Sequence, residues 1–172
     1  MITHAGMRLM VLLLVAGASA CAMPGKPRGG PVAEGPGTLT AARKYLEGRW
    51  QLESFEVFPP GKPPIALKGQ GTLTYDEFGN LHMEIRTDEP TADLLRAAGI
   101  YTRDGMISTD GRTAVDLQNR TLTYIVKDQA QSTGPLALNR PRHWQVEADL
   151  LTVTTKDDGG APLSVGRWRR MP

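Results

Sequence analysis

The amino-acid sequence predicts an all-β fold, a single antiparallel meander β-barrel. Apolar and polar residues alternate in most segments after residue 49, as they do in strands that bury one face. Short clusters of Gly, Pro, Asn and Asp separate these segments at hairpin spacing. The 172 residues suffice for one core. We expect about eight or nine strands that close on themselves, because closure removes exposed edges; a two-sheet sandwich is the alternative.

Residues 1–20 have the composition of a secretory signal peptide. Arg8 precedes an apolar run, residues 9–16, which is followed by small residues at 17–20. The apolar run is shorter than the roughly 20 residues that a transmembrane helix needs. We therefore expect residues 1–20 to be removed on export.

Cys21 follows this leader and is the only cysteine of the chain. A single cysteine excludes a disulfide within a monomer and a structural zinc site built from cysteines. Residues 21–39 are rich in Gly and Pro and lack periodicity, so they are expected to form a flexible linker. The folded domain is then expected to cover residues 40–172.

The residues Ala18, Ser19, Ala20 and Cys21 resemble the lipobox of bacterial lipoproteins. The resemblance implies that Cys21 carries acyl chains such as palmitate and anchors the protein to a membrane. Ala22, in place of Asp, implies the outer membrane, with the domain facing the periplasm. Position 18 departs from the family, in which Leu is usual; ordinary cleavage that leaves a free thiol on Cys21 is the alternative.

The first half of the domain contains a short helix and three strands. Residues 38–45 favour a helix, which Gly48 would end. A strand is expected from residue 49, followed by a Pro-rich loop at 59–64 that fits no sheet interior. Residues 72–75 form the next strand. Leu81, Met83 and Ile85 alternate with His82, Glu84 and Arg86, the clearest half-buried strand of the chain.

The second half begins with a short helix at residues 92–98, which Thr91 would cap. Asp110-Gly111 lies between two short apolar segments, 106–109 and 113–116, and predicts a tight hairpin turn. Residues 129–141 read as a long loop. The remaining strands are expected at 121–126, 144–147, 151–155 and 163–170.

Several of these segments resemble those of bacterial lipocalin-like domains, which belong to the calycins. The opening strand contains Gly48-Arg49-Trp50, like the Gly-x-Trp signature of that family. Residues 71–75, 149–154 and 166–170 are similar to later strands of the group. In lipocalins a late arginine packs on the signature indole and closes the barrel. The resemblance therefore implies that Arg167 or Arg169 contacts Trp50 near Gly48, as a cation–π pair.

The inward-facing residues of the barrel either fill its interior or surround a cavity for one small ligand. The sequence leaves both possibilities open. The candidates for a cavity lining are Trp50, Leu52, Leu73, Tyr75, Met83, Ile85, Tyr124, Val126, Trp144 and Val146.

Other kinds of site find little support in the sequence. The net charge is +2 and the charged residues are interspersed, which argues against nucleic acid as a partner. His82 and His143 are expected on outward faces, so no metal site is predicted. No catalytic constellation and no cofactor motif is present. Arg140, Arg142 and Trp144 form either a rim site for an anionic headgroup or a solvated loop edge.

These observations lead to one functional expectation and one alternative. We expect a lipocalin-like lipoprotein of the bacterial cell envelope, monomeric and non-enzymatic, that binds a small hydrophobic or amphipathic ligand. The alternative is a filled barrel that acts as a protein-interaction module in the envelope. The choice of ligand binding depends on analogy between folds, which is a weak basis for function.

Overall fold

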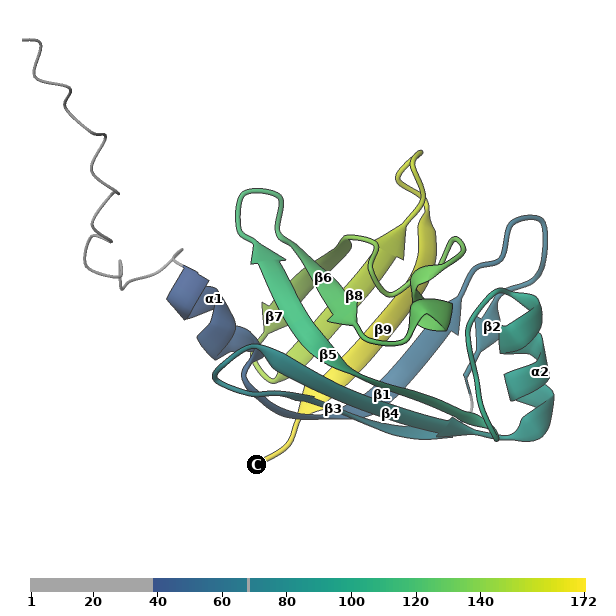
Figure 1. The fold of residues 1–172 in the computed structure, drawn as a ribbon, viewed down its shortest axis with the longest axis horizontal. Coiled ribbons are helices and arrows are strands. Elements are labelled where there is room, and N and C mark those ends of the chain that lie inside the picture. The colour runs from purple at the N-terminus through teal and green to yellow at the C-terminus, as the bar shows by residue number, and fades with distance from the viewer. Residues whose placement is uncertain (1–38, 68) are drawn as a thin grey trace, which may run out of the picture. The chain divides into compact units, whose positions relative to one another are not determined.

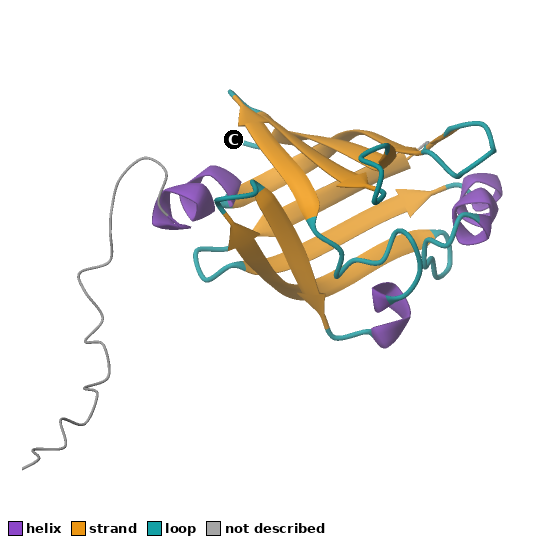
Figure 2. Cartoon of the chain, turned by 90° about the horizontal axis from the view of Figure 1, so that it is seen from above, coloured by secondary structure: helices purple, strands orange, loops and turns teal. Residues whose placement is uncertain are grey.

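The computed structural model describes residues 39–67 and 69–172. Eight strands form a closed antiparallel barrel, to which a two-residue strand, β2, is added (Figures 1 and 2). The predicted all-β barrel is thus confirmed, and closure excludes the two-sheet sandwich. The strands are β1 Gly48–Val57, β2 Ile65–Ala66, β3 Gly69–Tyr75, β4 Asn80–Thr87, β5 Met106–Asp116, β6 Thr121–Val126, β7 Arg142–Glu147, β8 Leu150–Lys156 and β9 Pro162–Arg170.

The barrel is a meander in which each strand pairs with the next, β2 excepted. Strand β1 closes it, because one edge of β1 pairs with β3 and the other with β9. The closing ladder runs from Trp50 opposite Arg170 to Val57 opposite Ser164. The weakest junction lies between β6 and β7, which share the pairs of Thr121 with His143 and Leu122 with Arg142.

Every second residue of each strand points into the barrel, and these side chains form the core. In β4, Leu81, Met83 and Ile85 are buried and the residues between them are exposed, as predicted. The period of two therefore assigns the buried face of this strand correctly. The whole cluster of buried apolar residues includes Leu46, Trp50, Leu52, Val57, Leu67, Leu73, Tyr75, Leu81, Met83, Ile85, Leu95, Ile107, Leu122, Tyr124, Leu151, Val153 and Trp168.

The hairpin predicted at Asp110-Gly111 is wrong. Strand β5 runs without a turn from Met106 to Asp116. Gly111 lies inside it, paired with Leu81 on one side and Val126 on the other. A Cβ at Gly111 would lie 2.5 Å from the carbonyl oxygen of Ile125. The absence of a side chain at Gly111 thus lets the backbones of β5 and β6 approach closely, which is a known reason for glycine inside a strand.

Replacement of Gly111 by Ala is expected to destabilise the barrel by about 1–3 kcal/mol, because the new methyl group must push β6 away. Chemical denaturation monitored by tryptophan fluorescence measures this change. Gly159→Ala is the matched control, since a Cβ there would meet its nearest atom at 3.4 Å, an ordinary contact. Equal stability of the two variants would contradict the close-approach explanation.

Two short α-helices and one 3-10 turn occupy the ends of the barrel (Figure 1): α1 Leu39–Leu46 at one end, α2 Glu89–Ala97 and η1 Gln129–Ser132 at the other. Thr91 was expected to cap α2, but Asp88 is the N-cap. Its Oδ1 accepts a hydrogen bond of 2.8 Å from the Thr91 backbone N–H. Asp is a preferred N-cap residue, and its carboxylate also favours the positive end of the helix dipole.

The leader, Cys21 and most of the predicted linker lie outside the described residues. Within residues 39–67 and 69–172, no helix has the length and apolarity needed to cross a membrane. The predicted anchor therefore stays a prediction.

Candidate functional site

Trp50 closes the end of the barrel that carries α1. Its side chain is fully buried, and its Nε1–H donates a hydrogen bond of 2.8 Å to the carbonyl oxygen of Leu46, the last residue of α1. The guanidinium of Arg170 lies over the indole, 4.1 Å from the ring centroid. Gly48 has a φ of +125°, and a Cβ there would lie 2.9 Å from Nη1 of Arg170. These contacts join α1, β1 and β9.

The expectation that Arg167 or Arg169 packs on Trp50 is wrong, since Arg170 occupies that position. Both expected arginines are exposed on the outer face of β9. Arg167 lies 3.7 Å from the carboxylate of Glu56, and Arg169 donates to that of Glu53. Trp168 and Arg170 both lie on the inner face of β9, because residues two positions apart in a strand face the same side.

A small cavity of about 70 Å³ lies in the opposite half of the barrel, beneath the segment that joins β6 to β7. Of the predicted lining, Met83, Ile85 and Tyr124 border this cavity. The other predicted residues pack in or against the solid core: Trp50, Leu52, Leu73, Tyr75, Val126, Trp144 and Val146. The full lining consists of Phe55, Met83, Ile85, Ile100, Ile107, Tyr124, Leu136, Leu138, Arg142, Val153, Thr155, Ser164, Gly166 and Trp168.

Arg142 reaches into the barrel from the first position of β7 and is only 5% exposed. It is therefore no solvated loop edge. Nη1 donates to the carbonyl oxygens of Leu138 and Arg140 at 2.5 and 2.8 Å. Nη2 donates to those of Ala137 and Leu136 at 2.9 and 3.5 Å. One guanidinium thus holds a whole turn of the segment between β6 and β7 in place.

The charge of Arg142 has no acidic partner among the described residues, since every described ion pair involves another cation. Burial lowers the pKa of Arg142 from its ordinary value, because the protein interior disfavours the charged form. The face of the Tyr124 ring, 5.0 Å from the guanidinium carbon, offsets part of this cost. Carbonyl dipoles and a ring quadrupole, rather than a carboxylate, therefore stabilise the charge.

Tyr75 and Tyr124 share a buried hydrogen bond of 2.7 Å between their hydroxyl oxygens. Burial is the main cause that raises the pKa of both phenols, with that of Tyr75 well above its ordinary value of about 10. One hydroxyl donates to the other, so one O–H of the pair has no acceptor within the pair. Sequence analysis placed both tyrosines inside but gave no sign of their contact.

The buried tyrosines predict a loss of stability in alkali. Above pH 10 the phenols of the unfolded chain lose their protons while the buried ones keep theirs, so the folded state binds more protons. The free energy of unfolding should therefore fall as the pH rises above about 10, by up to ~1.4 kcal/mol per pH unit and per tyrosine. Denaturant titrations at pH 9 and pH 11 measure it. Tyr75→Phe should reduce the fall by about half; an unchanged fall would contradict the assignment.

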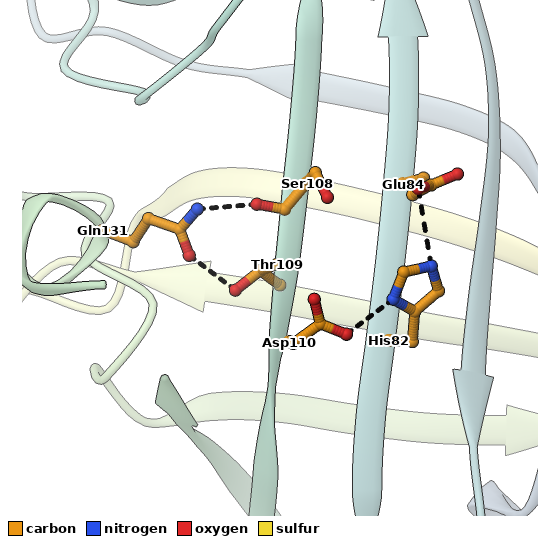
Figure 3. A network of polar contacts seen from close by, with 6 residues as sticks. All are labelled: His82, Glu84, Ser108, Thr109, Asp110 and Gln131. Carbon is orange, nitrogen blue, oxygen red and sulfur yellow. Dashed lines mark hydrogen bonds and ion pairs between the residues drawn. The ribbon is translucent and has the colours of Figure 1, made fainter. Parts of the chain in front are cut away.

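Gln131 fixes η1 to the barrel wall (Figure 3). Its Oε1 accepts a hydrogen bond of 2.5 Å from the Thr109 hydroxyl, and its Nε2 donates to the carbonyl oxygen of Ser108 at 2.7 Å. The side chain is buried, although η1 lies in a segment that the sequence indicates only as a loop. Together with Arg142, Gln131 holds the segment from 127 to 141 over the cavity.

Replacement of Gln131 by Ala is expected to loosen this segment. The substitution leaves a buried hydroxyl and a carbonyl without partners, which costs about 1–3 kcal/mol. Hydrogen exchange should accelerate in residues 127–141 more than in β8 and β9. Asp110→Asn is the control, because Asp110 is the neighbour of Thr109 in β5 but lies on the exposed outer face. Similar acceleration of exchange in both variants would contradict the role assigned to Gln131.

The outer-face contacts in Figure 3 are of a different kind. His82 Nδ1 lies 2.7 Å from Asp110 Oδ1, and Nε2 lies 3.6 Å from Glu84 Oε1. His82 is exposed, as is His143, as predicted. Exposed pairs of this kind contribute about 0–1 kcal/mol. In the part of the chain that the structure describes, no group of three or more His, Cys, Asp or Glu could hold a metal ion.

The fold is that of a lipocalin-like barrel: eight antiparallel strands, closed by the first and the last. The chain is similar to a solved structure, that of a DUF4847 family protein from Bacteroides vulgatus ATCC 8482. The identity is 12%, the match covers 75% of this chain and 96% of the other, and the TM-score is 0.41. No family model matches the chain. No curated protein matches it either.

Proposed function

We propose that this protein is a non-enzymatic binding lipoprotein of the bacterial cell envelope, anchored through acylated Cys21. The barrel, as a monomer, would hold a small hydrophobic or amphipathic molecule. The observation that carries the proposal is the interior cavity beneath residues 127–141. Its walls are mostly apolar, and a small number of polar groups project into it, which is the usual composition of a ligand site.

The cover of this cavity also supports binding. Residues 127–141 lie between β6 and β7, which share only two ladder pairs. Polar contacts of Gln131 and Arg142 hold the segment in place. Because only two ladder pairs join β6 and β7, this junction should open more easily than the longer ladders of the barrel, so it offers a route by which a ligand enters.

The second candidate is a filled barrel that binds another protein of the envelope. It is favoured by the size of the cavity, about 70 Å³, which is below the roughly 300–1,000 Å³ of ordinary ligand sites. A larger groove, about 580 Å³, lies on the outside between the Pro-rich loop after β1 and α2. Leu94 of α2 lines it and is exposed.

Native mass spectrometry of the full chain, extracted from its own envelope in mild detergent, tests the proposal. We expect a mass excess that corresponds to one small molecule per barrel, recoverable by organic extraction. An acylated N-terminal Cys21 should appear in the same spectra. A bare barrel together with a co-purified protein in constant ratio would instead establish the second candidate.

A variant that narrows the cavity locates the bound molecule. A Cβ at Gly166 would lie 2.9 Å from Trp168 Nε1 and 3.3 Å from the Phe55 ring, inside the cavity lining. Gly166→Ala should therefore reduce the bound fraction, while Gly159→Ala in the turn after β8 should not. An equal bound fraction in both variants would place the molecule outside the barrel.

A further inference from the structure

The cavity contains a single charged side chain, that of Arg142. The other lining residues are apolar except for Tyr124, Thr155, Ser164 and the indole of Trp168. No carboxylate belongs to the lining, and no described ion pair includes Arg142. The interior at this place is therefore electropositive, in surroundings of low polarity where charge interactions are strong.

The carbonyl groups around Arg142 orient the guanidinium without neutralising it. Four carbonyl oxygens from residues 136–140 accept all of its Nη–H bonds. The remaining donor, Nε–H, has no acceptor among the described residues. A guanidinium held in this way is already positioned before an anion binds. Binding therefore costs little conformational entropy of the Arg142 side chain.

Two further donors in the lining have no acceptor in the described part of the chain. Ser164 donates to Thr155 Oγ1 at 3.1 Å, which leaves the hydroxyl hydrogen of Thr155 available. The Nε1–H of Trp168 also lacks a described acceptor. It faces the space in front of Gly166, where a Cβ would come within 2.9 Å of it. The polar groups of the cavity are thus mainly hydrogen-bond donors around one positive charge.

We infer that the cavity binds a small amphipathic monoanion, a carboxylate with a short apolar chain, whose head lies at Arg142. The inference rests on the proposed function and specifies the class of ligand. Carboxylate oxygens accept hydrogen bonds from several donors at once. The donors left for them in the lining are Arg142 Nε–H, the Thr155 hydroxyl and Trp168 Nε1–H. Met83, Ile85, Ile107 and Val153 supply apolar contacts for the chain.

The cavity volume limits the length of the chain. About 70 Å³ is well below the roughly 300–1,000 Å³ of ordinary ligand sites. A short-chain carboxylate therefore fits better than a long fatty acid, unless residues 127–141 move. We expect affinity to rise with chain length to a maximum and then to fall.

Isothermal titration calorimetry with hexanoate and hexan-1-ol tests the charge requirement. Both probes carry the same apolar chain, and only hexanoate carries the anion. The full chain is first freed of bound molecules by organic extraction and refolding. We expect hexanoate to bind at least about tenfold more tightly, which is the effect of one charge-assisted hydrogen bond or more. Equal affinities, or tighter binding of the alcohol, would overturn the inference.

Charge variants then assign the binding to Arg142. Arg142→Gln should weaken hexanoate binding far more than hexan-1-ol binding, while Arg142→Lys should retain part of the difference. Arg112→Gln is the matched control, because it removes one cation from the outer face of β5. Equal loss in Arg112→Gln and Arg142→Gln would show a general effect of charge and overturn the assignment.

A second measurement needs no variant and therefore remains decisive when Arg142→Gln does not fold. In hexanoate labelled with ¹³C at the carboxyl carbon, the pKa of the bound acid should be lower than that of the free acid, because a nearby cation favours the ionised form. A raised or unchanged pKa would overturn the inference. Recovery of a neutral molecule from the envelope would overturn this inference but leave the proposed function standing, whereas a bare barrel would overturn both.

Discussion

Replacement of Trp50 by Ala will lower the free energy of unfolding by about 3–5 kcal/mol, as expected for a large aromatic side chain lost from a core. Trp50 is fully buried and contacts both α1 and Arg170. The substitution removes the indole core contact, the hydrogen bond to Leu46 and the ring beneath the guanidinium. Urea titration at neutral pH, followed by circular dichroism, gives the difference directly.

Two controls separate these contributions. Trp50→Phe keeps most of the apolar contact but removes the Nε1–H donor to Leu46, so its cost should be smaller. Phe78→Ala removes an exposed ring from the turn after β3 and should change stability by less than about 0.5 kcal/mol. If Trp50→Ala costs no more than Phe78→Ala, Trp50 does not close the barrel end as described.

Replacement of Arg142 by Met should also be costly, by about 3 kcal/mol or more. Met fills similar space but donates no hydrogen bond, so the carbonyl groups of residues 136–140 lose their common partner. The carbonyl oxygens of Ala137 and Leu138 keep backbone N–H donors, from Arg140 and Tyr124. Those of Leu136 and Arg140 lose their donor, at a cost of about 1–3 kcal/mol each until the segment moves and water reaches them. The same variant should therefore expose residues 133–141 to rapid hydrogen exchange.

Arg112→Met is the control that separates the loss of the buried contacts of Arg142 from the loss of an arginine side chain in general. Arg112 lies on the outer face of β5, so its loss should change stability by less than about 0.5 kcal/mol. Cleavage by a protease within residues 133–141 provides an independent measurement of the loosened segment. A fully stable Arg142→Met variant with a protected segment would contradict the role given to the guanidinium.

The period of two carried most of the fold prediction. It predicted the buried face of β4 and the all-β class, while closure was expected because it removes exposed edges. In β9 the same period places Arg170 on the face of Trp168, whereas the family resemblance pointed to Arg167 or Arg169, which lie on the exposed face. The same period also connects Arg142 with Trp144 and Val146, so the inward position of Arg142 could have been read from the sequence.

Other features depend on contacts between distant segments. Asp110-Gly111 has the local composition of a turn, but pairing with β4 and β6 on both sides makes it part of a long strand. The hydrogen bond between Tyr75 and Tyr124 joins residues 49 positions apart. The guanidinium of Arg142 is held by carbonyl groups of residues 136–140, with no carboxylate beside it among the described residues, an arrangement that depends on how that segment folds back over β7. Such facts follow from tertiary register, which local patterns do not encode.

The closure of β1 on β9 brings the two ends of the domain together. Met171 N–H donates to the Arg49 carbonyl oxygen at 2.8 Å, and Arg170 Nη1 donates to that of Glu47 at 2.5 Å. The eight barrel strands therefore form a closed ring in which every neighbouring pair except β9 and β1 is also consecutive along the chain. A short peptide could join the ends, and new ends could be opened in the exposed β8–β9 turn, a circular permutation that keeps every ladder of the barrel.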